Sequence, residues 1–423
     1  KAGRLDRTFS NNGKACVRIG QPSDYAYALA LQPDGDILVA GTANAGVSNT
    51  DLGLVRFRPD GTKDPDFGHH GKVQTDLGGQ EDAFDVAIQP DGRIVVSGWS
   101  AGKMIVVRYR PNGRLDAGFG RGGVVAIDID RYDMARAVAI QPDGAIVVAG
   151  LASDGSLGRP VLARLLPDGS LDGTFGTGGL VIGKKKWHFA PEDLSLQPDG
   201  RIVVSGVRLP SVEVRRYLTD GRSDASFGST GRVNTPLSPS MHTAVALRPD
   251  GDIVVTGTLA GDHGDFGVAA LRPDGSLDGT FGTYGIAKVD FGGTADEALA
   301  VAIDAGGSVI LGGDAIGEGR LFAVARLLPD GSLDASFGHD GRVTTGGGEL
   351  GFVQDLALDG YGRIVAAGVA SPQGDLHGPA LSRGLEPEGW GEIRPRAARR
   401  VGSSTGPAVS PWRPGHGGRR ARA

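Results

Sequence analysis

The sequence predicts an all-β fold: a seven-bladed β-propeller with four antiparallel strands per blade, closed by the N-terminal strand. Three observations predict it. A phrase of the form Leu-Asp-x-x-Phe-Gly-x-x-Gly recurs seven times, with Ser10, Lys63 and Ser223 as single departures in three copies. A Gln-Pro-Asp-Gly turn or a variant of it recurs between the phrases, and short apolar runs separate these motifs. A unit repeated at a nearly fixed period indicates an array of small supersecondary units, none of which can bury a core alone.

The recurring phrase is marked by a phenylalanine that is present in every copy, at spacings of 52 to 58 residues: Phe9, Phe67, Phe119, Phe175, Phe227, Phe281 and Phe337. An aspartate three residues before each phenylalanine precedes a turn, where aspartate side chains accept backbone N–H groups. Because this aspartate is present in all seven units, we expect a structural role for it.

Each repeat provides four short strands, which we name a to d in chain order. Strand a leads into the first turn, as in 28–31, and strand b follows it, as in 37–40. Strand c is typified by 104–109 and strand d, after the phrase, by 72–76. Two-residue alternation and β-branched runs bounded by Gly and Pro are typical of strands. No segment shows a sustained helical period.

The two ends of the repeat array complement each other. The chain starts with a single d strand near 14–19 and ends with an a, b and c set at 352–385. We therefore expect residues 14–19 to pair with a c strand near 380–383, which would close the ring and remove its edges. Residues 1–389 form the propeller in this interpretation, and residues 390–423 form a disordered tail rich in Arg, Gly and Pro.

An arginine ends strand c in six units, while Ala270 takes its place in the remaining one. We expect each arginine to pair with the aspartate of the following phrase, and Asp278 to find another partner. The expected pairs are Arg56–Asp64, Arg108–Asp116, Arg164–Asp172, Arg216–Asp224, Arg326–Asp334 and, across the ring closure, Arg383–Asp6.

Composition excludes several classes of function. Eight of the 44 basic residues but only one of the 49 acidic residues lie in 391–423, so the remainder carries a net charge of −12. Such an acidic body is a poor nucleic-acid binder, because phosphate contacts need clustered Lys and Arg. No apolar run is long enough to span a membrane as a helix. Cys16 is the single cysteine, which excludes a disulfide framework.

The phrase, the Gln-Pro-Asp-Gly-x-Ile-Val-Val-x-Gly hairpin and the Arg-(Tyr/Leu)-x-Pro-Asp-Gly end of strand c resemble the bacterial delta-60 repeat over roughly residues 1–389. The resemblance implies a propeller-like repeat protein that is extracellular or at the cell surface. It implies neither an activity nor catalytic residues.

The loops divide between two faces. The a–b turns and c–d phrases form what we call the repeat face, and the d–a and b–c loops form the variable face. Loops that vary on a rigid scaffold commonly bind ligands. Our candidate contacts lie in one d–a loop and one b–c loop: Lys184, Trp187, His188, Asp262, His263 and Asp265.

Carboxylates suggest two further sites. Asp128, Asp130 and Asp133 crowd one d–a loop, where their oxygens would suit Ca²⁺, although their spacing matches no twelve-residue calcium loop. Asp85, Asp193 and Asp355 occupy one position of strand a, where other units have alanine. If that position faces the axis, three carboxylates converge on the channel.

The sequence favours a non-enzymatic, monomeric propeller without a cofactor, secreted or in the bacterial cell envelope, that binds a protein or saccharide ligand on its variable face. The alternative is a hydrolase or lyase that acts on a small or saccharide substrate at the channel mouth. Propellers serve both functions, so the fold does not separate the two hypotheses. Unrepeated His, Asp and Glu side chains gathered at the channel mouth would favour the enzyme.

Overall fold

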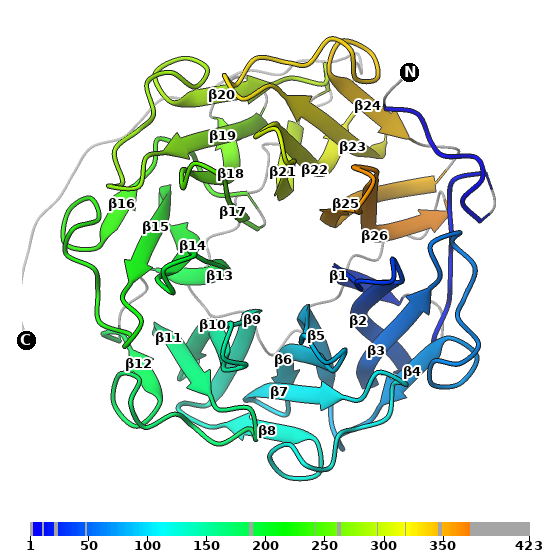
Figure 1. Ribbon diagram of the computed structural model, residues 1–423, viewed down its shortest axis with the longest axis vertical. Coiled ribbons are helices and arrows are strands. Elements are labelled where there is room, and N and C mark those ends of the chain that lie inside the picture. Colours follow the sequence, from blue (N-terminus) through cyan, green and yellow to red (C-terminus); the bar gives the residue numbers. More distant parts are fainter. Residues whose placement is uncertain are drawn as a thin grey trace, which may run out of the picture.

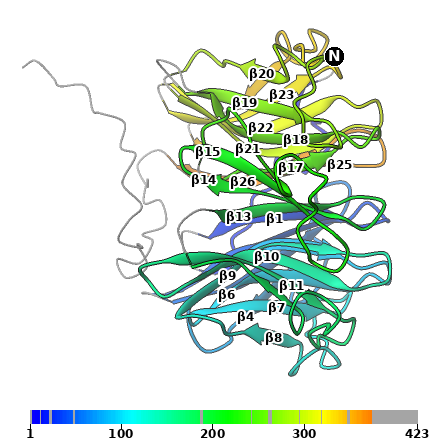
Figure 2. The ribbon, with the colours of Figure 1, turned by 90° about the vertical axis from the view of Figure 1, so that its left-hand side faces the viewer.

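The computed structural model describes residues 3–372, except residues 11, 21–23, 47–48, 186–188, 241, 260–263, 294, 318 and 346–348. This part of the chain forms 26 β-strands, which are arranged as small sheets around a central axis (Figure 1). The side view in Figure 2 places the connections between strands on the two flat faces of the ring.

Six of the sheets have four antiparallel strands each, in chain order from the axis outward. Their bounds are β1 (Tyr25–Leu31), β2 (Ile37–Gly46), β3 (Asn49–Phe57) and β4 (Lys72–Thr75); β5 (Glu81–Ile88), β6 (Ile94–Ser100), β7 (Lys103–Tyr109) and β8 (Val124–Ile127); β9 (Tyr132–Ile140), β10 (Ile146–Ser153), β11 (Gly158–Leu165) and β12 (Leu180–Ile182); β13 (Ala190–Leu196), β14 (Ile202–Arg208), β15 (Ser211–Tyr217) and β16 (Arg232–Asn234); β17 (Val245–Leu247), β18 (Ile253–Leu259), β19 (Asp265–Leu271) and β20 (Ile286–Val289); β21 (Ala295–Ile303), β22 (Val309–Ile316), β23 (Arg320–Leu327) and β24 (Arg342–Thr345). A further sheet has two strands, β25 (Glu349–Leu358) and β26 (Ile364–Pro372).

The prediction of seven four-stranded blades closed by an N-terminal strand is wrong. The structure has six four-stranded blades and the two-stranded sheet β25–β26. Residues 14–19 form no strand, and only an isolated bridge joins Ser10 to Lys14. A strand forms where its backbone groups find a hydrogen-bonded neighbour. Among the described residues no third strand follows β26, and the expected partner at 380–383 lies outside them.

Side-chain packing joins the two-stranded sheet to the first blade. Both β25 and β26 contact β1. Between the sheets, Phe9, Ala15, Val17 and Ile19 of the N-terminal segment pack with side chains of the first blade and with one of β26: Ile37, Val55, Phe57 and Val365. This segment therefore fills the junction with apolar surface, although it adds no strand.

The expected hairpin turn forms between β1 and β2. The backbone carbonyl of Asp36 accepts a hydrogen bond from the N–H of Gln32 (2.8 Å), and the N–H of Gly35 donates to the Gln32 carbonyl (2.9 Å). Gly35 has a φ of 89°, a left-handed conformation that glycine adopts at little cost. The local sequence therefore sets the connection between the two inner strands of a blade.

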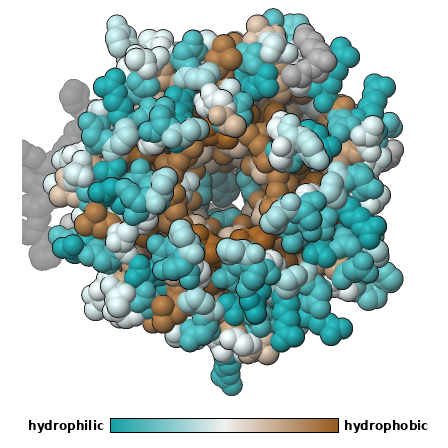
Figure 3. All heavy atoms as spheres, in the orientation of Figure 1, coloured by the Kyte–Doolittle hydropathy of each residue, from teal (hydrophilic) through white to brown (hydrophobic). Residues whose placement is uncertain are grey.

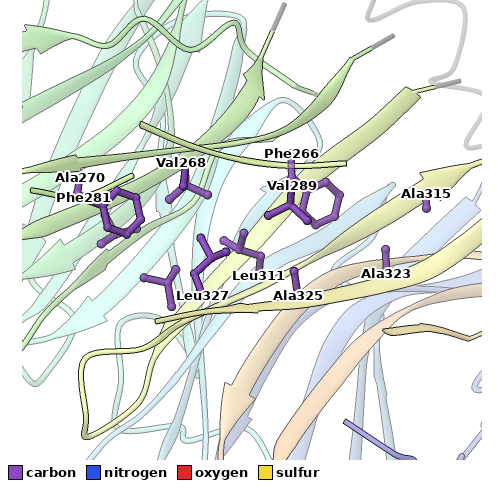
Figure 4. Close-up of a cluster of buried hydrophobic side chains, with 14 residues drawn as sticks. Phe266, Val268, Ala270, Phe281, Val289, Leu311, Ala315, Ala323, Ala325 and Leu327 are labelled. Atoms are coloured by element: carbon purple, nitrogen blue, oxygen red, sulfur yellow. The ribbon is translucent and has the colours of Figure 1, made fainter. Parts of the chain in front are cut away.

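The hydrophobic core lies between neighbouring blades. In Figure 4, Phe266, Val268 and Phe281 of the fifth blade face Leu311 and Leu327 of the sixth. A phrase phenylalanine belongs to the buried cluster at each of the five junctions between the six four-stranded blades. At the first of these junctions the Phe67 ring is fully buried, and the N–H of the following glycine, Gly68, donates to the Asn112 carbonyl of the next blade (2.9 Å). The recurrent phrase thus joins each four-stranded blade to the next one.

The strand-c arginines lie beside the phrase aspartates in the five pairs whose members are both described. The nitrogen–oxygen distances are 2.5 Å for Arg56–Asp64, 2.9 Å for Arg108–Asp116, 2.7 Å for Arg164–Asp172, 2.7 Å for Arg216–Asp224 and 2.6 Å for Arg326–Asp334. Arg383 lies outside the described residues, and Asp6 instead lies 3.4 Å from Arg363.

In the unit with Ala270, an arginine of the first turn takes over contacts that the strand-c arginine makes in the other units. Arg248, which stands where most first turns have glutamine, places its guanidinium 4.9 Å from the centre of the Phe281 ring and donates to the Pro329 carbonyl of the next blade (2.8 Å). Arg272 lies 3.5 Å from Asp278. Two departures from the repeat, at 248 and 270, therefore compensate each other.

Candidate functional site

The sequence-predicted ligand contacts lie mostly outside the described residues, namely Trp187, His188, Asp262 and His263. Lys184 is exposed just after β12. Asp265 is the first residue of β19, is buried, and pairs with Lys288 at 2.6 Å. Both described residues lie on the variable face, but no ligand contact follows from their positions.

The three aspartates predicted as a metal site each have partners within the protein. Asp128 pairs with Lys103 and Asp130 with Arg159, both at 2.8 Å. Asp133 is buried and accepts hydrogen bonds from the N–H groups of Ile129 and Asp130. Calcium binding by this loop stays a prediction, and it would have to displace these partners.

Carboxylates gather more closely at two other blade junctions of the variable face. Asp51, Asp76 and Glu81 have ligand oxygens within 4.8 Å of one another, and Asp265, Asp290 and Asp296 form a similar group. Burial raises the pKa of Glu81, and the charges of Asp51 and Asp76 raise it further. These side chains are the described residues best placed to hold a metal ion.

The inner strands share a bulge that positions side chains at the axis. In the pairing of β1 with β2 the register shifts between Ala26 and Ala28, so Tyr27 is the extra residue. The same shift recurs in five other inner strands, where the extra residues are Phe84, Arg136, Glu192, Leu299 and Gln354. Bulges of this kind redirect a side chain and often lie beside functional sites.

The extra residues of successive blades contact one another. The Tyr27 and Phe84 rings meet edge to face with centres 5.9 Å apart, and the Arg136 guanidinium lies 4.6 Å from the centre of the Phe84 ring. Tyr25 stacks on Tyr27 at 6.2 Å. Because these residues lie in the first half of strand a, they are nearer the variable face. We call Tyr27, Phe84, Arg136, Glu192 and His242 the axial arc.

Opposite charges complete the axial arc. His242 Nδ1 lies 3.2 Å from Glu192 Oε2. Burial by itself would raise the pKa of Glu192, but the positive charge of Arg136 and the His242 contact outweigh it and lower that pKa. The arc therefore combines an aromatic surface with a cation, a carboxylate and an imidazole. An open passage is visible at the centre of the ring in Figure 3, bordered by hydrophobic residues.

Asp85, Asp193 and Asp355 lie on the inner strands and bind the neighbouring blade. Asp85 accepts a hydrogen bond from the N–H of Val138 (2.7 Å), Asp193 from that of Val245 (2.8 Å) and Asp355 from that of Leu29 (2.7 Å). The residue before each donor is an alanine, which leaves room for the carboxyl group. These side chains therefore connect inner strands around the channel.

Burial raises the pKa of all three carboxyls, to about 7 for Asp193 and to about 6 for Asp355, and well above its usual value for Asp85. The charge of Asp355 adds to the increase at Asp193. Because the folded-state pKa exceeds the unfolded value near 4, each group stabilises the fold at low pH. That contribution is lost as the pH rises through the folded-state pKa.

We therefore expect Asp193→Asn, which can still accept the Val245 hydrogen bond, to become more stable relative to the wild type as the pH rises from 4 to 8. The relative gain should reach at least about 1.4 kcal/mol, the free energy of one pKa unit. Urea denaturation of both proteins at several pH values measures it. A constant difference would contradict the raised pKa, and Asp199→Asn on an exposed turn provides the control.

A groove of about 540 Å³ on the outer rim, between β12 and the loop at 221–223, offers little chemistry. Arg222, the charged residue that lines it, already pairs with Asp220 at 2.7 Å.

Sequence reasoning missed the axial arc. Its signal was one position of the aligned repeats that holds a different residue in every unit, directly before a position that holds only Ala or Asp: Tyr27, Phe84, Arg136 and Glu192. The ligand contacts predicted from the sequence lie in the variable loops instead.

Comparison with known families supports the repeat interpretation. Six segments, 32–67, 89–119, 141–175, 197–227, 248–281 and 307–337, match the family described as a domain of unknown function (DUF5122) beta-propeller. Five of them run from the first turn to the phrase phenylalanine. The chain is a β-propeller repeat protein.

Solved structures similar to this propeller have diverse descriptions. The WD40 repeats of RRP9 are 11% identical with a TM-score of 0.51, covering 84% of this chain and 91% of theirs. A catalytically inactive virginiamycin B lyase from Staphylococcus aureus with quinupristin is 11% identical (TM-score 0.49, covering 83% and 94%). A gluconolactonase from Xanthomonas campestris is 18% identical (TM-score 0.37, covering 66% and 80%). The similarity to RRP9 concerns the fold alone, and nothing about this chain is inferred from the other two structures.

No curated protein matches the propeller's sequence. In the part of the chain that the structure describes, no helix has the length and hydropathy of a membrane span.

Proposed function

We propose that this propeller is a binding protein that holds its ligand at the variable-face mouth of the channel, on the axial arc. The observation that carries the proposal is the contact between unrepeated side chains of successive inner strands, Tyr27, Phe84 and Arg136. A scaffold that repeats elsewhere has no structural need for a different residue at this position in each blade. Such differences are expected where a ligand is recognised.

The chemistry of the axial arc suits a ligand with both polar groups and an apolar face. Tyr27 and Phe84 offer aromatic surface, while Arg136 and Glu192 offer a charged donor and a charged acceptor. Saccharides and peptides present this combination. We therefore propose a saccharide or a peptide segment of a partner protein as the ligand, in agreement with the sequence-based hypothesis.

Membership in the delta-60 repeat family, which would place the protein in the bacterial cell envelope or among secreted proteins, is part of the same proposal. It is supported by the motif resemblance over the repeats.

Glycan and peptide arrays probed with the purified chain test the binding function. For any ligand found, we expect Tyr27→Ala to weaken binding at least about tenfold, because aromatic anchors dominate binding energy. Tyr284→Ala is the matched control, since this tyrosine is 84% exposed on the repeat face. If Tyr284→Ala weakens binding and Tyr27→Ala does not, the ligand site lies on the repeat face and the proposal fails.

The His242–Glu192 contact favours a second candidate function, a hydrolase or lyase acting at the same mouth. An imidazole oriented by a carboxylate can transfer protons. The two functions are separated by mass spectrometry of the ligand after incubation. An intact ligand supports binding, whereas cleavage that is lost in His242→Ala supports the enzyme.

A further inference from the structure

The junction between the first and second blades holds three carboxylates in a small space. Asp51 is the third residue of β3, Asp76 follows β4, and Glu81 begins β5 of the next blade. Their ligand oxygens lie within 4.8 Å of one another. Asp51 is 4% exposed and Glu81 is fully buried, while Asp76 is exposed to solvent.

Two oxygens of this group have no hydrogen-bond partner. Asp51 Oδ2 accepts from Gln74 (2.7 Å) and Glu81 Oε1 from Ser100 (3.1 Å), but Asp51 Oδ1 and Glu81 Oε2 are buried and unpartnered. Among the described residues none forms an ion pair with Asp51, Asp76 or Glu81. A buried carboxylate oxygen without a donor is costly, so it indicates a missing charge or ligand.

The equivalent junction between the second and third blades shows what is missing. Leu52 pairs with Thr75 in the first blade as Met104 pairs with Ile127 in the second. The residues just before and just after these pairs therefore correspond, so Lys103 is the counterpart of Asp51 and Asp128 is the counterpart of Asp76. There the Lys103 ammonium pairs with Asp128 at 2.8 Å. One junction thus carries its own cation, and the other has a third carboxylate at the same place.

We propose that Asp51, Asp76 and Glu81 bind a divalent cation, with Ca²⁺ as the natural occupant. All three ligands are carboxylate oxygens, and Ca²⁺ binds such oxygens in irregular geometries. Water from the open side, next to Asp76, completes its coordination shell. Mg²⁺ demands a more regular octahedron, and transition metals prefer nitrogen or sulfur ligands. The ion joins the d–a loop to both blades and replaces the charge that Lys103 supplies one junction further on.

The similar group at the junction of the fifth and sixth blades is already partly neutralised. Lys288 lies 2.6 Å from Asp265, at the position that Gln74 occupies in the first blade. A weaker cation site is therefore expected at Asp265, Asp290 and Asp296 than at the Asp51 group.

Isothermal titration of the EDTA-treated full chain with CaCl₂ tests the proposal. We expect a site with a Kd of about 10⁻⁵ to 10⁻³ M, the range of calcium sites with few charged ligands. At a free Ca²⁺ concentration about 100 times the Kd, the melting temperature should rise by about 3 °C.

Asp51→Lys copies the neighbouring junction and is the decisive variant. It should remove one calcium site, and in EDTA it should melt above the wild type because the lysine supplies the missing charge. Asp199→Asn, on an exposed turn of the repeat face, should leave calcium binding unchanged. Glu81→Gln gives a second measurement in case Asp51→Lys folds poorly, and it should also remove the site.

Absence of calcium binding by the wild type at about 5 mM Ca²⁺ would overturn the proposal. So would an unchanged number of sites in both Asp51→Lys and Glu81→Gln. Because the readouts are calcium affinity and thermal stability, they do not depend on the ligand proposed for the axial arc.

Discussion

Replacing Arg108 with alanine is expected to lower the free energy of unfolding by about 3–5 kcal/mol. The Arg108 guanidinium and the Asp116 carboxylate are both buried and lie 2.9 Å apart. The same guanidinium lies 4.4 Å from the centre of the Phe119 ring and donates to the Pro167 carbonyl of the next blade. The substitution leaves the buried carboxylate with only the more exposed arginines Arg93 (3.1 Å) and Arg110 (3.7 Å), and it removes a contact between blades.

Arg110→Ala is the matched control, because Arg110 approaches the same carboxylate at 3.7 Å with a largely exposed side chain. An exposed ion pair contributes about 0–1 kcal/mol. Equilibrium unfolding in urea compares the two variants. Equal losses for Arg108→Ala and Arg110→Ala would show that burial of the pair is unimportant.

Phe175→Ala is expected to lower the free energy of unfolding by about 3–5 kcal/mol, the usual cost of emptying the space of a buried aromatic ring. The ring is fully buried among residues of the third and fourth blades, including Leu162 and Val204. Gly221 of the fourth blade lies so close that an added Cβ would come within 3.0 Å of the ring. On that side the ring meets the backbone of a glycine, which has no side chain to fill the resulting cavity.

Guanidinium denaturation measures this loss of unfolding free energy, and two further variants serve as controls. Phe175→Leu keeps most of the volume and should lose much less. Tyr361→Ala removes an aromatic ring that is 88% exposed, so its effect should stay within about 0.5 kcal/mol. If Phe175→Ala were as stable as Tyr361→Ala, the phrase phenylalanines would not hold neighbouring blades together.

Parts of the candidate site could be predicted and parts could not. The position of Asp85, Asp193 and Asp355 on the inner strands followed from the period of strand a. Their partners did not, because each accepts its hydrogen bond from a neighbouring blade more than 50 residues away in sequence. The Asp51 group was missed for the same reason, since its three members come from two blades.

The sequence by itself determined the repeat, its turns and the residues of each phrase, because these rest on contacts within a few positions. Arg108 and Asp116, for example, are eight residues apart at the end of one strand and the start of the next connection. Such local patterns recur along the chain and can therefore be recognised from the sequence alone. The resemblance between six stretches of chain and one propeller family has the same origin.

Only the tertiary structure decided how the ring is completed and what lines its axis. The repeat count predicted seven equal blades, whereas the structure has six of four strands and one sheet of two strands, joined to the first blade by the packing of Phe9, Val17 and Ile19. The bulges that bring Tyr27, Phe84 and Arg136 together depend on strand pairing and on the curvature of the ring. Contacts between blades arise only after every blade has taken its place, so a single repeat does not encode them.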